Sequence, residues 1–187
     1  MLKLTALILY NINMSNFPII LIAHNLRSSY NVGSIFRIMD GLGLKTIYLT
    51  GNSPYPITIN DNRLHHIAIN NDRQIRKTSL GAEKSINYLH HQDIIQLINQ
   101  LKIKKYQIVA LEQTTTSINL IDFRVDSPIA LIIGNEITGI DDQVLEVVDQ
   151  SIEIPMQGLK ESFNVSSATS MTLFYLKYRQ DIINSLS

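Results

Sequence analysis

The chain has 187 residues, 45% of them hydrophobic, with no cysteine and with 16 basic residues balanced by 16 acidic ones. This length suits one domain, and the apolar content is enough to form a core, so an intrinsically disordered chain is excluded. The lack of cysteine excludes disulfides, thiolate metal sites and a cysteine nucleophile, whereas zero net charge does not exclude a nucleic-acid partner, because a local basic patch can still exist.

The N-terminal segment combines Lys3 with the largely apolar run Leu4–Tyr10, which is the composition of a short secretion signal. The single charge, the short run and the lack of a small-residue cleavage site argue against that interpretation. No apolar run has the length of a membrane span. We expect a cytoplasmic protein, which the lack of cysteine fits. Met14 directly precedes the first convincing strand, and we therefore expect residues 1–13 to be a peripheral extension and residues 14–187 to form the folded domain.

Strands and helices alternate at the start of the folded region. Phe17–Ala23 is an apolar run rich in β-branched residues, which predicts a buried strand. Asn31–Leu42 has apolar residues at helical spacing and is followed by Gly43, which predicts a helix and its end. Thr46–Thr50 is predicted as a second strand, and the prolines and asparagines of Gly51–Asn62 predict a loop.

The pattern is weakest over residues 63–90. A short helix is expected around residues 63–69, and a polar stretch, Asn70–Thr78, follows it. Beyond this region, Asp93–Lys104 has the spacing of an amphipathic helix, and Tyr106–Leu111 is predicted as a strand.

The last third of the chain continues the alternation. Pro128–Ile133 is the clearest buried strand, and Asp141 or Asp142 is expected to cap a short helix after it. Ser151–Ile154 is predicted as the last strand and Val165–Ile183 as a long final helix. Because strands alternate with helices throughout, the expected fold class is α/β, with a mainly parallel sheet sandwiched by helices.

Three polar clusters follow predicted strands, at residues 25–37, 134–139 and 154–165. Open parallel sheets place their ligands at the carboxyl ends of the strands, so these clusters are candidates for one binding site. Each cluster alone also fits a simpler interpretation, in which serines, asparagines and glycines cap helices and form turns. The three together are far more specific than any one of them.

The clusters resemble the three motifs of the SpoU or TrmH-type RNA ribose methyltransferases of the SPOUT superfamily. The resemblance covers about residues 17–180, with the motifs in the family's order and spacing. The matching residues are Asn31, Gly33 and Arg37 in the first motif, Gly134, Asn135, Glu136 and Gly139 in the second, and Ile154, Pro155, Met156, Gly158, Ser162, Asn164, Val165 and Ser166 in the third. Phe163 stands where the family usually has leucine, and it remains large and apolar.

This resemblance implies a structure as well as an activity. Members of the family fold into an α/β domain with a C-terminal trefoil knot and form homodimers, in which the final helix supplies part of the interface. The knot holds S-adenosyl-L-methionine in a bent shape. By similarity, the cofactor-binding residues are Leu111, Gly134, Ile154, Ser162 and Phe163.

The implied reaction is methylation of a ribose 2′-hydroxyl of tRNA or rRNA, with no metal ion. The implied catalytic residues are Arg37, Asn31, Glu136, Ser162 and Asn164. A guanidinium is a poor base because its pKa is about 12 or more, so we expect Arg37 to stabilise the developing alkoxide electrostatically. The other four residues are then expected to orient Arg37, the loops and the substrate ribose.

The RNA would be bound by basic residues around the site, for which the candidates are Arg27, Arg63, Arg73, Arg76, Lys77 and Lys160. One alternative is a non-catalytic RNA-binding protein that retains the fold, but it predicts damage to Arg37, Glu136 or Asn164, and all three are present. Another is a dinucleotide-dependent oxidoreductase, which needs a Gly-x-Gly-x-x-Gly turn after the first strand, where this chain has one glycine. The identity of the RNA and of the methylated nucleotide stays open.

Overall fold

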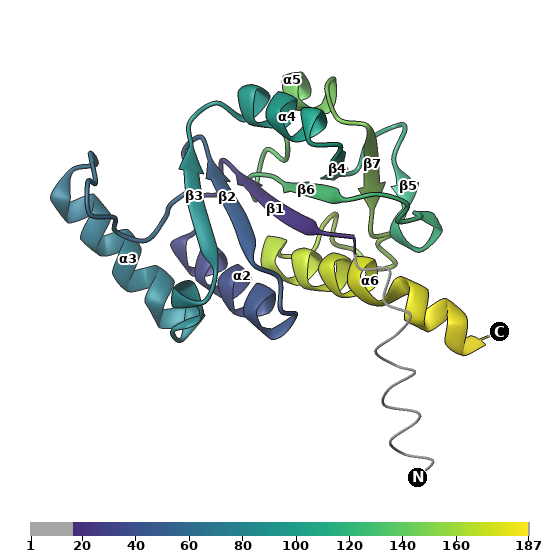
Figure 1. Ribbon diagram of the computed structural model, residues 1–187, viewed down its shortest axis with the longest axis horizontal. Coiled ribbons are helices and arrows are strands. Elements are labelled where there is room, and N and C mark those ends of the chain that lie inside the picture. The colour runs from purple at the N-terminus through teal and green to yellow at the C-terminus, as the bar shows by residue number, and fades with distance from the viewer. Residues whose placement is uncertain (1–16, 187) are drawn as a thin grey trace, which may run out of the picture.

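The computed structural model describes residues 17–186, with side chains up to residue 179, as one sheet covered by helices on both faces (Figure 1). The expected peripheral extension, residues 1–13, and the alternative start at Met14 lie outside the described residues. No helix in the described part of the chain is both long and apolar enough to cross a membrane.

The sheet has seven strands in the order β3-β2-β1-β6-β4-β7-β5, and every neighbouring pair is parallel. The strands are β1 (Ile19–His24), β2 (Thr46–Thr50), β3 (Asn87–His91), β4 (Gln107–Leu111), β5 (Ile118–Asn119), β6 (Ile129–Ile133) and β7 (Gln150–Glu153). The central strands β1 and β6 are buried along their whole length, as expected of parallel strands covered on both faces. The predicted parallel α/β sheet is therefore confirmed.

Each face of the sheet has its own set of helices (Figure 1). One face packs against α2 (Ser29–Gly41) and α6 (Val165–Leu186), with α3 (His65–Ser79) beside α2. The other face packs against α4 (Ile94–Ile103) and α5 (Asp142–Leu145). Two short 3₁₀ turns, η1 (Ala82–Lys84) and η2 (Leu120–Asp122), complete the described elements.

Alternate side chains of β1 point into the two cores. Leu21 and Ala23 belong to the core that includes α2 and α6, whereas Ile20 and Ile22 belong to the core that includes α4. This period of two is what a strand buried on both faces requires. The chain reverses direction across the sheet between β1 and β6, so the loops after these two strands meet at a topological switch point, where open α/β sheets bind ligands.

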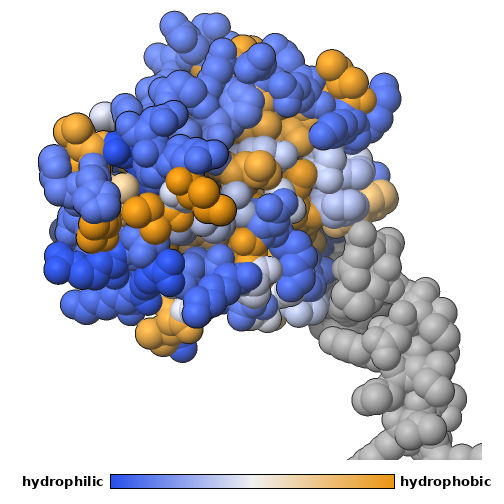
Figure 2. Space-filling model, turned by 60° about the vertical axis from the view of Figure 1, so that its left-hand side comes forward, coloured by the Kyte–Doolittle hydropathy of each residue, from blue (hydrophilic) through white to orange (hydrophobic). Residues whose placement is uncertain are grey.

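The weakest part of the sequence prediction is also where it was wrong. The helix expected over residues 63–69 continues to Ser79, so the polar stretch Asn70–Thr78 is helical, and the edge strand β3 was not expected. The two-residue strand β5 at the opposite edge of the sheet was also not expected. Only three residues of α3 are buried (Ala68, Ile75 and Ser79), so its apolar periodicity is too sparse to show in the sequence. The face of the molecule on this side is mainly hydrophilic, with apolar residues in separate groups (Figure 2).

Candidate functional site

A cavity of about 500 Å³ lies at the carboxyl ends of β4, β6 and β7. It is lined by the ends of these strands, by the loops that follow β4 and β6, and by the segment before α6, which comprise residues 111–113, 133–137, 139, 153–154, 161–165 and 168. This volume falls within the range of small-molecule sites. The second and third polar clusters of the sequence thus share one cavity.

The carboxylate of Glu136 joins the first cluster to the second. One oxygen, Oε1, accepts hydrogen bonds from Asn31 Nδ2 at 2.8 Å and from the backbone N–H of Ser28 at 3.1 Å. The other oxygen, Oε2, accepts from the backbone N–H of Arg27 at 2.9 Å. The loop after β1 is therefore fastened to the loop after β6 at the rim of the cavity.

Asn31 and Asn164 extend this link to the third cluster. Asn164 Nδ2 donates to Asn31 Oδ1 at 3.3 Å, while Asn164 Oδ1 accepts from the backbone N–H of Ser166 at 2.9 Å. Asn164 is therefore both the cap of α6 that the simpler interpretation predicted and a bridge to α2. All three clusters converge through Asn31, Glu136 and Asn164.

The surroundings of Glu136 favour its ionised form. Partial burial opposes ionisation, but the hydrogen bonds from Arg27, Asn31 and Ser28 outweigh it and hold the pKa of Glu136 below its ordinary value. A carboxylate in this state is a weak base. Its arrangement suits it to positioning the two loops rather than to accepting a proton.

The cavity is acidic. Four of its lining residues are glutamates (Glu112, Glu136, Glu153 and Glu161), and none of the lining residues is basic. The backbone of Gly134 lies so close to that of Gly139 that a Cβ at position 134 would be 2.6 Å from the Gly139 carbonyl. Glycine therefore allows the two ends of the loop after β6 to pack together. Such a cavity, acidic and bordered by closely packed backbone, suits a ligand with a positive charge.

Arg37 is the one predicted catalytic residue that lies away from the cavity of its own chain. It is exposed on α2, in a separate hollow that it shares with Ser34, Lys77 and Thr78. It lies six residues beyond Asn31, or about 9 Å further along the helix. The structure thus groups Asn31, Glu136, Ser162 and Asn164 at the cavity and leaves Arg37 outside it.

Two of the basic residues proposed for RNA are engaged within the chain. Arg63 pairs with Asp61 at 2.5 Å, and its guanidinium lies 3.4 Å from the centre of the Tyr55 ring. Arg76 pairs with Asp72 at 2.5 Å and with Glu83 at 3.5 Å. The other four candidates are exposed and form no ion pair within the described residues, so they are the better ones: Arg27, Arg73, Lys77 and Lys160.

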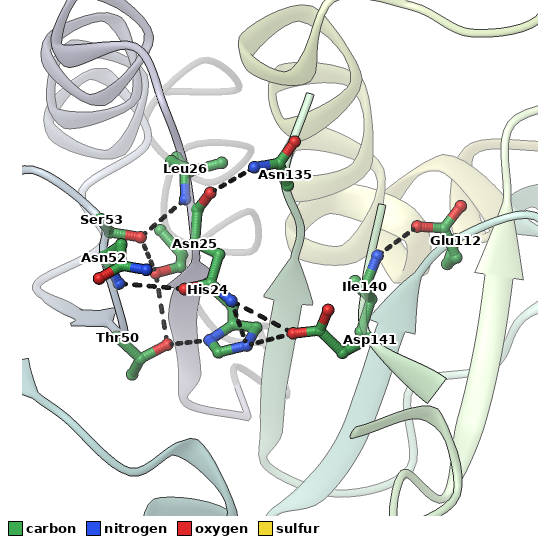
Figure 3. Close-up of polar contacts among 11 residues, drawn as sticks. His24, Asn25, Leu26, Thr50, Asn52, Ser53, Glu112, Asn135, Ile140 and Asp141 are labelled. Carbon is green, nitrogen blue, oxygen red and sulfur yellow. Dashed lines mark hydrogen bonds and ion pairs between the residues drawn. The ribbon is translucent and has the colours of Figure 1, made fainter. Parts of the chain in front are cut away.

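A partly buried polar network beside the site was not predicted from the sequence (Figure 3). His24, at the end of β1, has Nδ1 2.9 Å from Thr50 Oγ1 and Nε2 3.1 Å from Asp141 Oδ2. Burial lowers the pKa of His24, and the interaction with Asp141 offsets only part of that effect. Asp141 stands at the expected cap position of α5, but its side chain forms no capping hydrogen bond and instead contacts His24.

Asn25 connects this network to the loop after β6. Its backbone has a φ of +52°, a conformation that asparagine adopts more easily than most residues. Its carbonyl accepts from Asn135 Nδ2 at 2.9 Å, and its side chain donates to Asp141 Oδ2 at 3.2 Å. A histidine and an asparagine directly after an apolar strand were the only sequence signal for this network.

A family model described as the SpoU rRNA methylase family matches residues 18–174 of the chain. The tRNA (guanosine(18)-2′-O)-methyltransferase of Aquifex aeolicus is 26% identical over 156 residues, which cover 83% of this chain and 67% of the relative. The protein of the same name from Escherichia coli strain K12 is 30% identical over 148 residues, covering 78% of this chain and 56% of the relative. The chain thus spans about half to two thirds of these relatives.

Solved structures show the same fold. The Aquifex aeolicus TrmH/SpoU tRNA modifying enzyme superposes with a TM-score of 0.74 at 24% identity, covering 91% of this chain and 79% of that one. The SpoU methyltransferase AviRb from Streptomyces viridochromogenes, in complex with the cofactor AdoMet, gives a TM-score of 0.71 at 23% identity, covering 89% of this chain and 58% of that one.

Proposed function

The chain belongs to the SpoU rRNA methylase family, and from this membership and the geometry of the site we propose that it methylates a ribose 2′-hydroxyl of tRNA or rRNA with S-adenosyl-L-methionine. The observation that carries the proposal is the convergence of three distant motifs at one cavity through Asn31, Glu136 and Asn164. Both relatives are named 2′-O-methyltransferases of tRNA, and the family model is described as an rRNA methylase, so the comparisons support the substrate class.

The cavity fits the cofactor in size and charge. The five residues assigned to cofactor binding, Leu111, Gly134, Ile154, Ser162 and Phe163, all line it. Its glutamates match the positive charge of a sulfonium. When bound, S-adenosyl-L-methionine supplies an electrophilic methyl group, so the protein mainly has to position the reactants and exclude water.

The polar residues of the rim position the reacting groups. Glu136 fixes the loop after β1 by accepting from Arg27, Ser28 and Asn31. Asn31 and Asn164 hold the beginnings of α2 and α6 together, and Ser162 lines the cavity between them. We assign these residues to orienting the substrate ribose against the cofactor.

Arg37 is assigned the stabilisation of the developing alkoxide. Because Arg37 does not line the cavity of its own chain, this role requires the second protomer of a homodimer to bring a guanidinium to the cavity. The homodimer, the C-terminal trefoil knot and a cytoplasmic location are parts of the same proposal, which rests on membership of the family.

A single assay tests the proposed function. Purified protein is incubated with methyl-labelled S-adenosyl-L-methionine and with unmodified tRNA and rRNA, and the RNA is digested to nucleosides and analysed by mass spectrometry. We expect a 2′-O-methyl nucleoside. Base methylation, labelled protein, or RNA binding without methylation would each overturn the proposal.

The same assay tests Arg37. The Arg37→Ala variant should lose at least about 100-fold in rate, as expected for removal of a group that stabilises transition-state charge. Its affinity for S-adenosyl-L-methionine should stay within twofold of wild type, because the five residues assigned to cofactor binding are unchanged and Arg37 lies outside the cavity of its own chain. Arg124→Ala, which removes another exposed arginine, is the matched control and should keep full activity.

A further inference from the structure

A second pocket lies beside the cofactor cavity and shares Asn135 with it. Its volume is about 470 Å³, and its wall includes Asn25, Arg27, Asn52, Asn71, Asn135 and Thr138. These residues come from the loops after β1, β2 and β6 and from α3. We propose that this pocket receives the base of the RNA nucleotide whose ribose is methylated, an inference that rests on the proposed function.

The two adjacent cavities have opposite electrostatic character. The cofactor cavity has four glutamates and no basic residue in its wall, whereas the second pocket has one arginine and no acidic residue. A cationic cofactor favours the first environment. A nucleotide, which combines an uncharged base with an anionic phosphate, favours amides beside an exposed guanidinium.

Several polar groups of the pocket are unused within the described part of the chain. The Asn52 side chain and the Arg27 guanidinium form no hydrogen bond there, and neither does the Nδ2 of Asn71. Asn71 Oδ1 accepts from Ser29 Oγ at 3.2 Å, which fixes the side chain and leaves its donor free. Asn71 therefore offers a donor in a fixed position, and the unbonded Asn52 amide adds a second donor and an acceptor, which suits the edge of an unpaired base.

The floor of the pocket is held rigidly (Figure 3). Asn25 Oδ1 accepts from the backbone N–H of Asn52 at 3.0 Å, and Asn135 Nδ2 donates to the carbonyl of Asn25 at 2.9 Å. The Leu26 backbone N–H donates to Ser53 Oγ at 2.9 Å in the same region. Groups fixed before binding lose little conformational entropy when a ligand arrives, which favours selective recognition.

The position of the pocket connects base recognition with the reaction. Glu136, next to Asn135, lines the cofactor cavity. Its carboxylate accepts a hydrogen bond from the backbone N–H of Arg27, and Arg27 lines the second pocket. The loop segment that separates the two pockets is therefore one hydrogen-bonded unit. A nucleotide placed across it has its base on one side and its sugar towards the cofactor.

The test uses the full chain and the variants Asn52→Ala, Asn71→Ala and their combination. The probes are unmodified tRNA and 23S rRNA transcripts, first to locate the methylated nucleotide and then with each of the four bases at that position. Asn62→Ala, an exposed asparagine outside the pocket, is the matched control. Affinity for S-adenosyl-L-methionine and thermal unfolding are measured for every variant.

We expect wild type to prefer one base, and the double variant to lose about tenfold in kcat/KM for that base and to accept the four bases more equally. Cofactor affinity should stay within twofold. Equal use of all four bases by wild type, or an unchanged preference in the double variant, would overturn the assignment of this pocket to the base while leaving the proposed function intact. Failure of wild type to methylate any transcript would overturn both. Asn52 is exposed, so Asn52→Ala alone keeps the test informative if Asn71→Ala unfolds.

Discussion

Glu136 is the residue on which the link between the first and second clusters depends. Its carboxylate accepts one hydrogen bond from a side chain, Asn31, and two from backbone N–H groups, of Arg27 and Ser28. Burial makes ionisation less favourable, but these donors more than compensate, and the pKa of Glu136 is lowered. The charge of Glu136 therefore contributes to the stability of the folded loops.

The variant Glu136→Gln keeps the shape of the side chain but removes the charge. We expect a loss of up to about 1 kcal/mol in the free energy of unfolding at pH 7, because the carboxylate is only partly buried. Because the pKa of Glu136 is lower in the folded chain, its charge stabilises the folded state at any pH above the pKa of the unfolded chain, which is near 4.5. This stabilisation is lost as the pH falls through the folded-state pKa. Urea unfolding from pH 7 to pH 3 should show the difference between wild type and variant shrinking below pH 4.5. An equal difference at every pH, or the same loss in the exposed control Glu146→Gln, would contradict this account.

His24 gives a second titration, at higher pH. The folded chain resists protonation of this buried histidine, so its pKa lies below the ordinary value of 6.5. As the pH falls below 6.5, the unfolded chain takes up a proton that the folded chain does not, and stability decreases. We expect the melting temperature of wild type to fall between pH 7.5 and pH 5, and His24→Gln to have a flatter profile over this range. The exposed His65→Gln is the control, and it should keep the wild-type slope.

At the scale of residues, the sequence indicated groups but not their contacts. Asn31, Glu136 and Asn164 could be selected because each belongs to a recognisable motif. The pairing of His24 with Asp141 could not, because the two residues lie 117 positions apart and neither belongs to a motif. The position of Arg37 outside the cavity was also not predictable, since it depends on how α2 is rotated against the sheet.

At the scale of elements, burial decided what could be predicted. The strands and helices that carry long apolar patterns, such as β1, β6 and α4, were predicted to within three residues at their ends. The missed strands, β3 and β5, form the two edges of the sheet, and the shortened helix, α3, packs beside α2; all three bury few side chains. Apolar periodicity in a sequence arises from the residues that an element buries, so an element with few buried residues has only weak periodicity.

The packing of α2 on α3 depends on a glycine. A Cβ at position 33 would collide with the Thr78 hydroxyl and the Ile75 carbonyl, and backbone atoms cannot move away easily. We expect Gly33→Ala to destabilise the protein by about 1–3 kcal/mol, as overpacking does. Gly41→Ala lies in the same helix with nothing within 4 Å of the added carbon, and it should be neutral or stabilising by up to about 1 kcal/mol. Urea unfolding of both variants checks this, and equal effects would show that the close approach of the helices is not the cause.

At the scale of the whole molecule, the site is a product of strand order. Asn31 and Glu136 are 105 residues apart, and Asn31 and Asn164 are 133 apart. They meet because β6 inserts beside β1, although β2, β3, β4 and β5 all lie between them in the chain. The position of the three clusters after strands indicated a shared site. Hydrophobic patterns do not predict which strands are neighbours, so the contacts between the clusters could not be derived from the sequence.

The outer face of α6 carries the last prediction. Met171 and Phe174 are 38% and 53% exposed, and the Phe174 ring lies 5.0 Å from that of Tyr178, so apolar side chains recur along one stripe of the helix. In the proposed homodimer this stripe packs against its counterpart around a two-fold axis. A buried, unpaired carboxylate at such an interface costs several kcal/mol, so Phe174→Glu should yield a monomer.

Size-exclusion chromatography with light scattering measures the mass of the Phe174→Glu variant in solution. The methylation assay measures how the loss of the dimer affects activity. If a second protomer brings Arg37 to the cavity, the monomeric variant should lose methylation while it retains the cavity and its affinity for S-adenosyl-L-methionine. Ile103→Glu places the same charge at a residue that is 79% exposed at the end of α4, and it should remain dimeric and active. A wild-type protein that is monomeric at micromolar concentration, or a monomeric Phe174→Glu variant with full activity, would show that each chain works alone and that Arg37 acts by some other route.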